Sequence, residues 1–267
     1  MIIYLRIKAC IFDLGGTIVD RYSLTPLLSL KKLFQRRNIY LTNDLIFKDM
    51  GKNKKDHINL ILNDSVILKQ WFKNYNEYPC NKDIDLLFDH FNLIQTKYSD
   101  EMIDVLPETK ACINYLDFNY IQTASTTGFN KKNMEIIRGK LERNNIYLDR
   151  YISSTCLDKP SRPHPFMIQE LMNRMNITDP KSVIKVDDTV VGIHEGMRAK
   201  CWTVGVARWS INMNISSIED AYGLHIYELQ DQLKQSRETL YEGGADFVID
   251  TLDELPQVIE HINNISK

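Results

Sequence analysis

The sequence predicts an α/β fold, in which a parallel sheet carries helices on both faces and a helical segment is inserted after the first strand. Two observations predict it. After Pro107, short apolar strands alternate with helical stretches, which is typical of a parallel sheet. Between the first strand and Pro107 the pattern is almost wholly helical. A chain of 267 residues suits one large domain or a core with a smaller inserted one.

The first strand is expected at residues 8–12, a short apolar run that stops at Asp13 and is broken by Gly15 and Gly16. Helical stretches follow, punctuated by Pro79. The helices expected in this part of the chain are residues 24–37, 43–49, 53–62, 66–75 and 84–98. We therefore expect a core domain at residues 1–21 and 106–267, and a helical domain at residues 22–105.

The second part of the chain continues the core. A Ser/Thr/Gly turn is expected after its first strand, and residues 211–242 are ambiguous, a loop plus a helix. The expected strands are residues 120–124, 151–154, 182–186, 201–206 and 247–249. The expected helices are residues 108–116, 131–144, 165–175, 192–199 and 252–262. In such sheets ligands bind beyond the carboxyl ends of the strands, so the residues there are the candidate site.

Composition excludes several classes of protein. A net charge of −2 and a pI near 6.3 indicate neither nucleic acid nor an anionic membrane as partner. The apolar N-terminal run carries Arg6 and Lys8, so we interpret it as a buried strand rather than a signal peptide, and no stretch is long enough for a membrane span. The five cysteines are widely spaced without a CxxC pair, which favours reduced thiols and a cytoplasmic protein.

The strand ends carry the candidate chemistry. Asp13 could point into the crevice, and the N–H groups of Gly15 and Gly16 could bind phosphoryl oxygens; alternatively, Asp13 only caps a turn. Hydroxyls and N–H groups in the segment Ser125-Thr126-Thr127-Gly128 could form an anion site, or simply cap the next helix.

Two further segments add charge. Arg162 in Ser161-Arg162-Pro163-His164-Pro165 could position a carboxylate and a phosphate, or lie in a surface loop before a helix. Asp187 and Asp188 end a buried strand, where two carboxylates repel unless a cation is near. Such hard oxygen ligands suit Mg²⁺; the alternative is one helix cap and one solvated Asp. The four segments in this order, at strand ends, indicate a phosphoryl-transfer site.

These motifs resemble the haloacid dehalogenase superfamily, in which an Asp attacks phosphorus. Within it, five segments are similar to the phosphonoacetaldehyde hydrolases. They are Met50-Gly51-Lys52-Asn53-Lys54-Lys55-Asp56-His57, Ser125-Thr126-Thr127-Gly128-Phe129, Arg162-Pro163-His164-Pro165-Phe166-Met167, Val186-Asp187-Asp188-Thr189, and Gly196 with Trp202-Thr203-Val204-Gly205-Val206. The resemblance runs from about residue 7 to 262. It implies a Rossmann-like core, a helical C1-type cap after the first strand and a homodimer formed through the cap.

The resemblance also implies roles for individual residues. Asp13 would be the nucleophile, Lys54 the Schiff-base lysine and His57 its proton-transfer partner. Met50 and the glycines Gly15, Gly16 and Gly128 would line the substrate and phosphate site, with Thr126, Thr127 and Arg162 holding the phosphoryl group. Asp13, the Gly15 carbonyl and Asp188 or Asp187 would bind Mg²⁺, with Asp188 the better match.

The residues fit cleavage of a carbon–phosphorus bond. Haloacid dehalogenase phosphatases carry a second Asp two residues after the nucleophile, which protonates the leaving alkoxide; here Gly15 stands there. A carbon leaving group needs an electron sink instead, which a lysine iminium supplies. Lys54 and His57 are three residues apart and would share a helix face. The predicted activity is hydrolysis of phosphonoacetaldehyde to acetaldehyde and phosphate.

Two alternatives remain open: a general phosphatase or phosphomutase of the same superfamily, and a binding protein that keeps the fold without catalysis. The chain also departs from the family. Gly15 stands where the family usually has Ala, and Phe129 stands where Tyr is common. Some members have Cys at the position of Ser23 and Asp at the position of Gly192. These departures bear on rate, substrate range and Mg²⁺ affinity more than on the fold.

Overall fold

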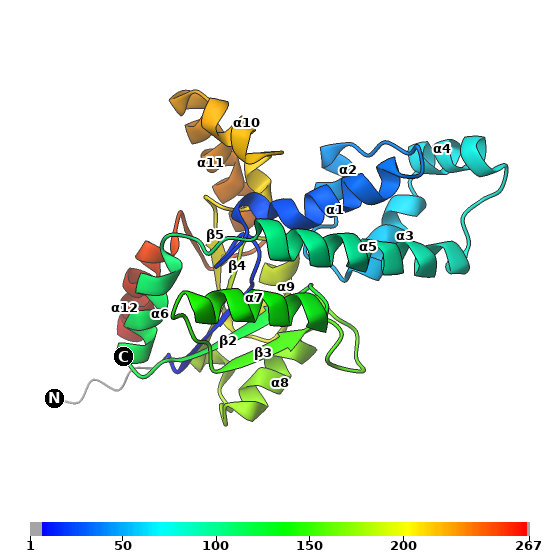
Figure 1. Ribbon diagram of the computed structural model, residues 1–267. Helices are drawn as coiled ribbons and strands as arrows, with labels where there is room; N and C mark the ends of the chain where they lie inside the picture. The colour runs from blue at the N-terminus through cyan, green and yellow to red at the C-terminus, as the bar shows by residue number, and fades with distance from the viewer. Residues whose placement is uncertain (1–6, 266–267) are drawn as a thin grey trace.

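The computed structural model describes residues 7–265 and places their strands in one six-stranded sheet of order β3-β2-β1-β4-β5-β6 (Figure 1). Every neighbouring pair of strands is parallel. The predicted α/β fold with a parallel sheet is confirmed. The strands are β1 Ala9–Phe12, β2 Gln122–Thr127, β3 Arg150–Ser153, β4 Val183–Asp187, β5 Trp202–Val206 and β6 Phe247–Ile249.

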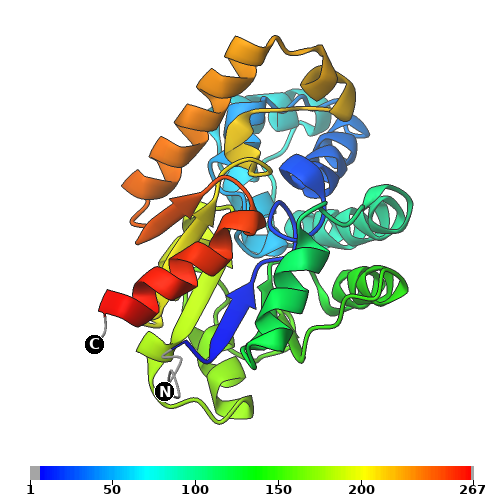
Figure 2. The ribbon, with the colours of Figure 1, turned by 90° about the vertical axis from the view of Figure 1, so that its left-hand side faces the viewer.

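Helices cover both faces of the sheet, so central strands are buried throughout. In β1, Cys10 and Phe12 pack on the face covered by α6 (Thr109–Phe118), α7 (Lys131–Arg143) and α12 (Leu255–Ile265). Ala9 and Ile11 pack on the opposite face against α8 (Phe166–Arg174). Figure 2 shows α6 and α12 together on one face of the strands. A run of apolar residues without alternation is therefore what this strand requires.

The segment between β1 and α6 is helical, as expected, and in Figure 1 it extends to one side of the sheet. Its apolar residues, among them Leu30, Trp71 and Phe91, belong to a cluster that also contains Ile193 and Leu240 from the last third of the chain. Its helices are α1 Leu24–Gln35, α2 Asn43–Phe47, α3 Lys54–Leu62, α4 Ser65–Tyr75 and α5 Asn81–Met102. The division into two domains at residues 22–105 stays a prediction.

The second strand differs from the expectation. Tyr120 is 94% exposed and has a φ of 57°, so it turns the chain instead of starting the strand at residue 120. β2 begins at Gln122 and continues through Thr127. Ser125, Thr126 and Thr127 therefore lie in the strand, where the sequence had indicated a turn.

The last third of the chain adds helices to the core. α9 (Val190–Arg198) packs on β4 and β5, and α11 (Ile226–Glu242) packs on β5 and β6. The ambiguous stretch 211–242 also contains a short α10 (Ile218–Gly223). The prediction of a loop and a helix in this stretch is thus confirmed, and α10 is a short helix in addition to the predicted one.

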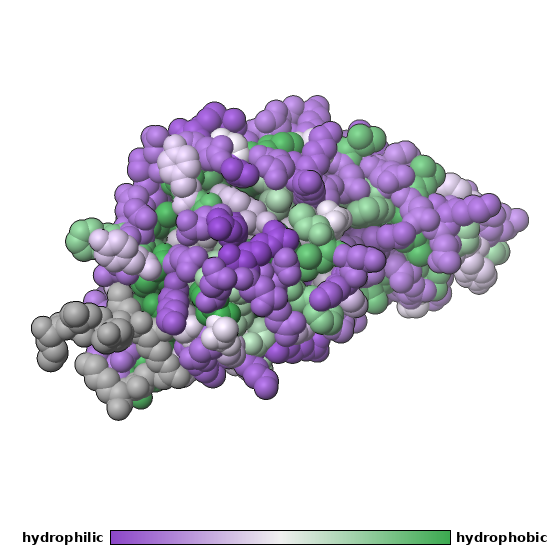
Figure 3. Space-filling view, turned by 90° about the horizontal axis from the view of Figure 1, so that it is seen from below, coloured by the Kyte–Doolittle hydropathy of each residue, from purple (hydrophilic) through white to green (hydrophobic). Residues whose placement is uncertain are grey.

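Across residues 7–265, no helix is both long enough and apolar enough to cross a lipid bilayer. On the face seen in Figure 3, hydrophilic side chains dominate and hydrophobic ones are scattered. The five cysteines are unpaired. Residues 1–6, the start of the run interpreted as a buried strand rather than a signal peptide, lie outside the described residues, as do residues 266–267.

Candidate active site

The predicted site residues meet at the carboxyl edge of the sheet. Asp13 directly follows β1, and its N–H donates to the Val186 carbonyl at 2.9 Å, which keeps it beside β4. Thr127 ends β2 and Asp187 ends β4. Arg162 lies in the loop between β3 and α8. Because parallel strands end at one edge, residues more than a hundred positions apart in the chain share one site.

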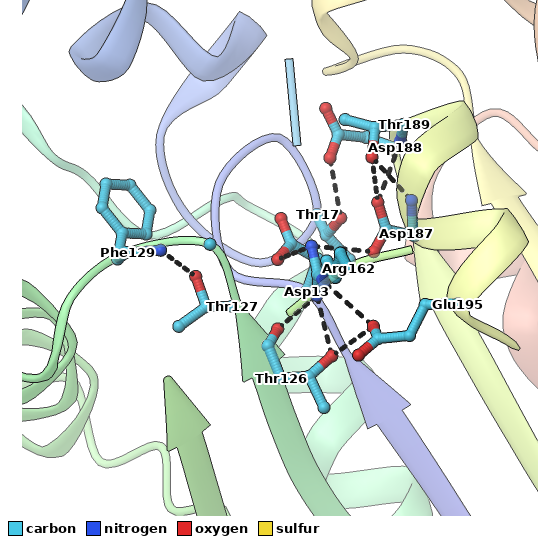
Figure 4. A network of polar contacts seen from close by, with 12 residues as sticks. Asp13, Thr17, Thr126, Thr127, Phe129, Arg162, Asp187, Asp188, Thr189 and Glu195 are labelled. Atoms are coloured by element: carbon cyan, nitrogen blue, oxygen red, sulfur yellow. Dashed lines mark hydrogen bonds and ion pairs between the residues drawn. The ribbon is translucent and has the colours of Figure 1, made fainter. Parts of the chain in front are cut away.

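Arg162 lies at the centre of this site, with its side chain 1% exposed (Figure 4). Its Nη1 is 2.9 Å from Asp13 Oδ1, while Nε donates to Glu195 Oε2 at 2.9 Å. Nη2 donates to the carbonyl and to Oγ1 of Thr126, at 2.6 and 2.7 Å. Burial alone would lower the pKa of Arg162, but the Asp13 and Glu195 carboxylates raise it above its ordinary value. Arg162 is thus a fixed cation whose Nη1 faces Asp13.

Sequence reasoning missed two members of this network, Lys185 and Glu195. Both side chains are fully buried. Lys185 Nζ donates to Thr126 Oγ1 at 2.9 Å and lies 2.9 Å from Asp187 Oδ2. A lysine inside an apolar strand is a usable signal, since a buried charge needs partners. Glu195 lies on α9 and gave no comparable signal.

The two threonines at the end of β2 point to different places. The Thr126 hydroxyl accepts a hydrogen bond from Arg162 and donates one to Glu195 at 2.9 Å. Thr127 lines the cavity in front of Asp13, and its Oγ1 accepts the Phe129 N–H at 3.2 Å. Adjacent strand residues face opposite sides of the sheet, so only Thr127 can reach a ligand in the cavity.

Three carboxylates form the acidic part of the site. Oxygens of Asp13, Asp187 and Asp188 lie within 4.8 Å of one another. Burial, with Asp187 and Asp13 as neighbouring charges, raises the pKa of Asp188 well above its usual range. Burial likewise raises the pKa of Asp13 to about 6, against the opposing effect of Arg162. Arg162 and Lys185 form ion pairs with Asp13 and Asp187, whereas Asp188 has no such partner among the described residues, and this donor set fits a divalent metal ion.

Asp187 and Asp188 differ in how their oxygens are used. Burial tends to raise the pKa of Asp187, but Lys185 and Arg162 bring it below the ordinary value. Asp188 accepts hydrogen bonds from the hydroxyls of Thr17 and Ser23, at 3.4 and 3.3 Å, and backbone N–H groups of Ile211 and Asp188 also act to lower its pKa. These donors are all neutral, whereas Asp187 faces two cations. Asp188 is therefore better placed than Asp187 to exchange its contacts for a metal ion.

Gly16 is required beside Asp188. Its φ is +68°, and a Cβ at this position would lie 2.2 Å from Asp188 Oδ2. A side chain would therefore both strain the backbone and displace the carboxylate.

A cavity of about 30 Å³ lies in front of Asp13, and Lys54 also lines it. This volume is far below the several hundred Å³ typical of pockets for drug-sized ligands. The described residues that line it are Asp13, Gly15, Ser23, Pro26, Met50, Gly51, Lys54, Thr127, Gly128, Phe129, Arg162 and Thr189.

Lys54 begins α3 and is only 6% exposed. Its Nζ lies 3.4 Å from Met50 Sδ. Burial lowers the pKa of Lys54 from 10.5 to about 8, although the Asp13 charge raises it. An appreciable fraction of Lys54 is therefore a neutral, nucleophilic amine near neutral pH.

The other basic residues near Lys54 do not share this setting. His57 lies one turn further along α3, is fully buried and does not line the cavity. Burial and the Lys54 charge hold the pKa of His57 well below its ordinary value, so its imidazole is neutral. Lys52 pairs with Asp49 and Lys55 with Asp85. Both lysines are thus engaged away from the cavity.

Comparisons with known proteins show which proteins this chain resembles. The chain is 29% identical over 259 residues to a phosphonoacetaldehyde hydrolase of Bacillus cytotoxicus, with 97% of each chain covered. It is 28% identical to a phosphonoacetaldehyde hydrolase of Bacteroides fragilis, covering 97% of this chain and 98% of the relative. A crystal structure described as a phosphonoacetaldehyde hydrolase-like protein from Oleispira antarctica superposes with a TM-score of 0.92 at 28% identity, covering 97% and 93%.

A more distant structure shares the fold alone. It is a β-phosphoglucomutase from Clostridium difficile, with a TM-score of 0.67 at 18% identity over 97% of this chain and 98% of that one. The family model for haloacid dehalogenase-like hydrolases matches residues 7–199, which include β1, the helical segment and the Asp187–Asp188 pair. The chain belongs to the haloacid dehalogenase-like hydrolase family.

Proposed function

We propose that this protein hydrolyses the carbon–phosphorus bond of phosphonoacetaldehyde, giving acetaldehyde and phosphate. The observation that carries the proposal is the position of Lys54. A buried amine whose pKa is lowered to about 8 lines the same small cavity as Asp13. The names of the relatives support the same substrate.

Lys54 would supply the electron sink. Its neutral amine adds to the aldehyde carbon, and uptake of one proton with loss of water gives an iminium ion. A carboxylate oxygen of Asp13 then attacks phosphorus. As the carbon–phosphorus bond breaks, its electron pair forms a carbon–carbon double bond and the π pair of C=N⁺ moves onto the nitrogen, which leaves an enamine on Lys54.

Water completes the turnover. One water cleaves the aspartyl-phosphate at Asp13 and releases phosphate. The enamine takes a proton on carbon, and a second water hydrolyses the imine, which releases acetaldehyde and restores Lys54. Since imine formation released one water, the net reaction consumes one. His57, a neutral imidazole one helical turn from Lys54, is our candidate for proton transfer at this nitrogen.

Gly15 supports this chemistry over that of a phosphate monoesterase. The position two residues after Asp13 carries no carboxyl group that could protonate an alkoxide leaving group. An enamine leaving group needs no such acid at the moment of cleavage. A phosphatase or phosphomutase would have to supply the proton from elsewhere.

The remaining residues would bind and orient the phosphoryl group. Arg162 Nη1 faces Asp13, and Thr127 and Gly128 line the same cavity. We propose Mg²⁺ as the metal, held by Asp13, Asp188 and the Gly15 carbonyl. When bound, Mg²⁺ would neutralise charge on the phosphoryl oxygens.

We also propose that residues 22–105 act as a cap that carries Lys54, and that the protein is a cytoplasmic homodimer joined through this cap. The family resemblance supports both statements. Light scattering coupled to gel filtration tests the second, since a monomer at micromolar concentration would contradict it.

The decisive experiment is borohydride trapping. Enzyme, Mg²⁺ and phosphonoacetaldehyde are mixed with borohydride, the modified peptide is mapped, and acetaldehyde is assayed in parallel. We expect a reduced adduct on Lys54, which Lys54→Arg abolishes together with acetaldehyde release. Lys55→Arg is the matched control, because Lys55 is exposed and paired with Asp85. Full acetaldehyde release by Lys54→Arg would refute the mechanism.

A further inference from the structure

Asp187 and Gly192 compete for one space. Asp187 ends β4, and Gly192 lies in the first turn of α9. A Cβ on Gly192 would lie 1.9 Å from both Cγ and Oδ2 of Asp187, and 2.2 Å from its Oδ1. No real side chain tolerates such contacts. The Asp187 carboxylate therefore stands where any side chain of residue 192 would begin.

One oxygen of the Asp187 carboxylate lies near two cationic side chains, and the other accepts hydrogen bonds at the start of α9. Its Oδ2 lies 2.9 Å from Lys185 Nζ and 3.4 Å from Arg162 Nη1. Its Oδ1 accepts the N–H and the hydroxyl of Thr189 at 3.0 and 2.8 Å. Thr189 Oγ1 in turn accepts the Gly192 N–H at 3.1 Å. With the side chain fully buried, these contacts fix the carboxylate in one orientation.

We propose that Asp187 is a positioning residue that takes the place of a side chain at position 192 and, from the end of β4, keeps Arg162 Nη1 directed at Asp13. Gly192 is then obligatory as long as residue 187 is an aspartate. The same carboxylate can be supplied from β4 or from α9, but not from both. The inference rests on the proposed function only in taking Arg162 as the group that binds the phosphoryl oxygens.

A double-mutant cycle tests whether a carboxylate at position 192 can replace the one at position 187. It compares wild type, Asp187→Gly, Gly192→Asp and the variant with both substitutions. The measurements are the Tm and the Kd for tungstate, a phosphoryl mimic, in the presence of Mg²⁺. Neither measurement depends on turnover.

Gly192→Asp places two carboxylates in one space, so we expect its Tm to fall by roughly 10 °C or more. Its tungstate affinity should fall by about tenfold or more as Arg162 loses its orientation. Adding Asp187→Gly should then raise the Tm again and bring the affinity to within about threefold of wild type, a strongly non-additive result. A double variant no better than Gly192→Asp would overturn the proposal.

A milder pair of variants covers the case in which Gly192→Asp does not fold. Gly192→Ala adds only the clashing methyl group and should weaken tungstate binding. Gly139→Ala on α7 is the control, since a Cβ there meets only Arg143 Nη1 at 3.6 Å. Equal Tm and tungstate affinity in the two variants would also overturn the proposal. If the cycle is coupled but the wild type cleaves no phosphonoacetaldehyde, the proposed function fails and this inference stands.

Discussion

Replacing Lys54 by Met should stabilise the protein near neutral pH. Below pH 8 the lysine is mostly protonated in both the folded and the unfolded chain, so folding has to bury an ammonium group. The pKa is 10.5 for an ordinary lysine and about 8 in the fold. At about 1.4 kcal/mol for each pH unit, the charge costs about 3 kcal/mol of stability. Methionine has a similar length and avoids this cost.

The sign of the pH dependence follows from the same pKa values. Between pH 8 and 10.5 the folded protein has lost the Lys54 proton, whereas the unfolded chain still holds it. The stability contributed by this group therefore rises with pH in that window. The advantage of Lys54→Met should be largest below pH 8 and should shrink towards pH 10.5.

Urea unfolding of wild type and Lys54→Met from pH 6 to pH 10 measures the effect. Lys55→Met is the matched control; Lys55 is half exposed and paired with Asp85, so no comparable gain is expected. At pH 7 a gain of about 3 kcal/mol corresponds to roughly 6–12 °C in Tm for a domain of this size. If Lys54→Met were less stable than wild type at pH 7, or if its gain were the same at pH 7 and pH 10, the reasoning would be refuted.

Four other predictions concern the site. Borohydride trapping on Lys54, followed by mass spectrometry at short times, should rise about tenfold per pH unit below pH 8 and level off above it; a flat profile contradicts this. Glu195→Gln removes a buried counter-charge and should lose about 3 kcal/mol in urea unfolding; a loss near zero argues against the network. Gly15→Ala should change stability by less than about 1 kcal/mol, since its Cβ meets neighbours at 3.4–3.7 Å, and should keep trapping at Lys54; a large loss in either assay contradicts this. Asp188→Asn should weaken Mn²⁺ binding, measured by electron paramagnetic resonance, by about tenfold or more; unchanged affinity excludes Asp188 as a ligand.

The strand ends were predictable because parallel strands finish at a common edge. Once an apolar run was recognised before Asp13 and another before Asp187, their proximity followed from the fold class alone. Arg162 could be placed in the site only through the motif around it, since a loop residue has no periodicity that locates its side chain.

Side-chain directions were not predictable in the same way. The sequence treats Thr126 and Thr127 as equivalent, yet one supports Arg162 and the other lines the cavity. Which of them faces the ligand depends on the register of β2, and the left-handed turn at Tyr120 shifted that strand along the chain. A shift of one residue would exchange their roles.

The buried network around Arg162 could not be predicted from the sequence for a different reason. Lys185 and Glu195 are ten residues apart on a strand and a helix, and both converge on the Thr126 hydroxyl. Such a pairing depends on how α9 packs on β4, which no local pattern encodes. A lysine within a buried strand indicates only that a charged or hydrogen-bonding partner must lie near it.

The position of Lys54 links the stability and the reactivity of the site. It is the first residue of α3, where the positive end of the helix dipole disfavours a further positive charge. Burial and the Arg162 charge act in the same direction and lower the pKa of the amine. The Asp13 charge opposes them, because a carboxylate in the same cavity favours the ammonium form. A cation bound at Asp13 and Asp188 would offset that carboxylate and free the amine further. Metal binding at the sheet edge and the nucleophilicity of Lys54 would therefore be coupled through electrostatics, although the two groups come from different parts of the fold.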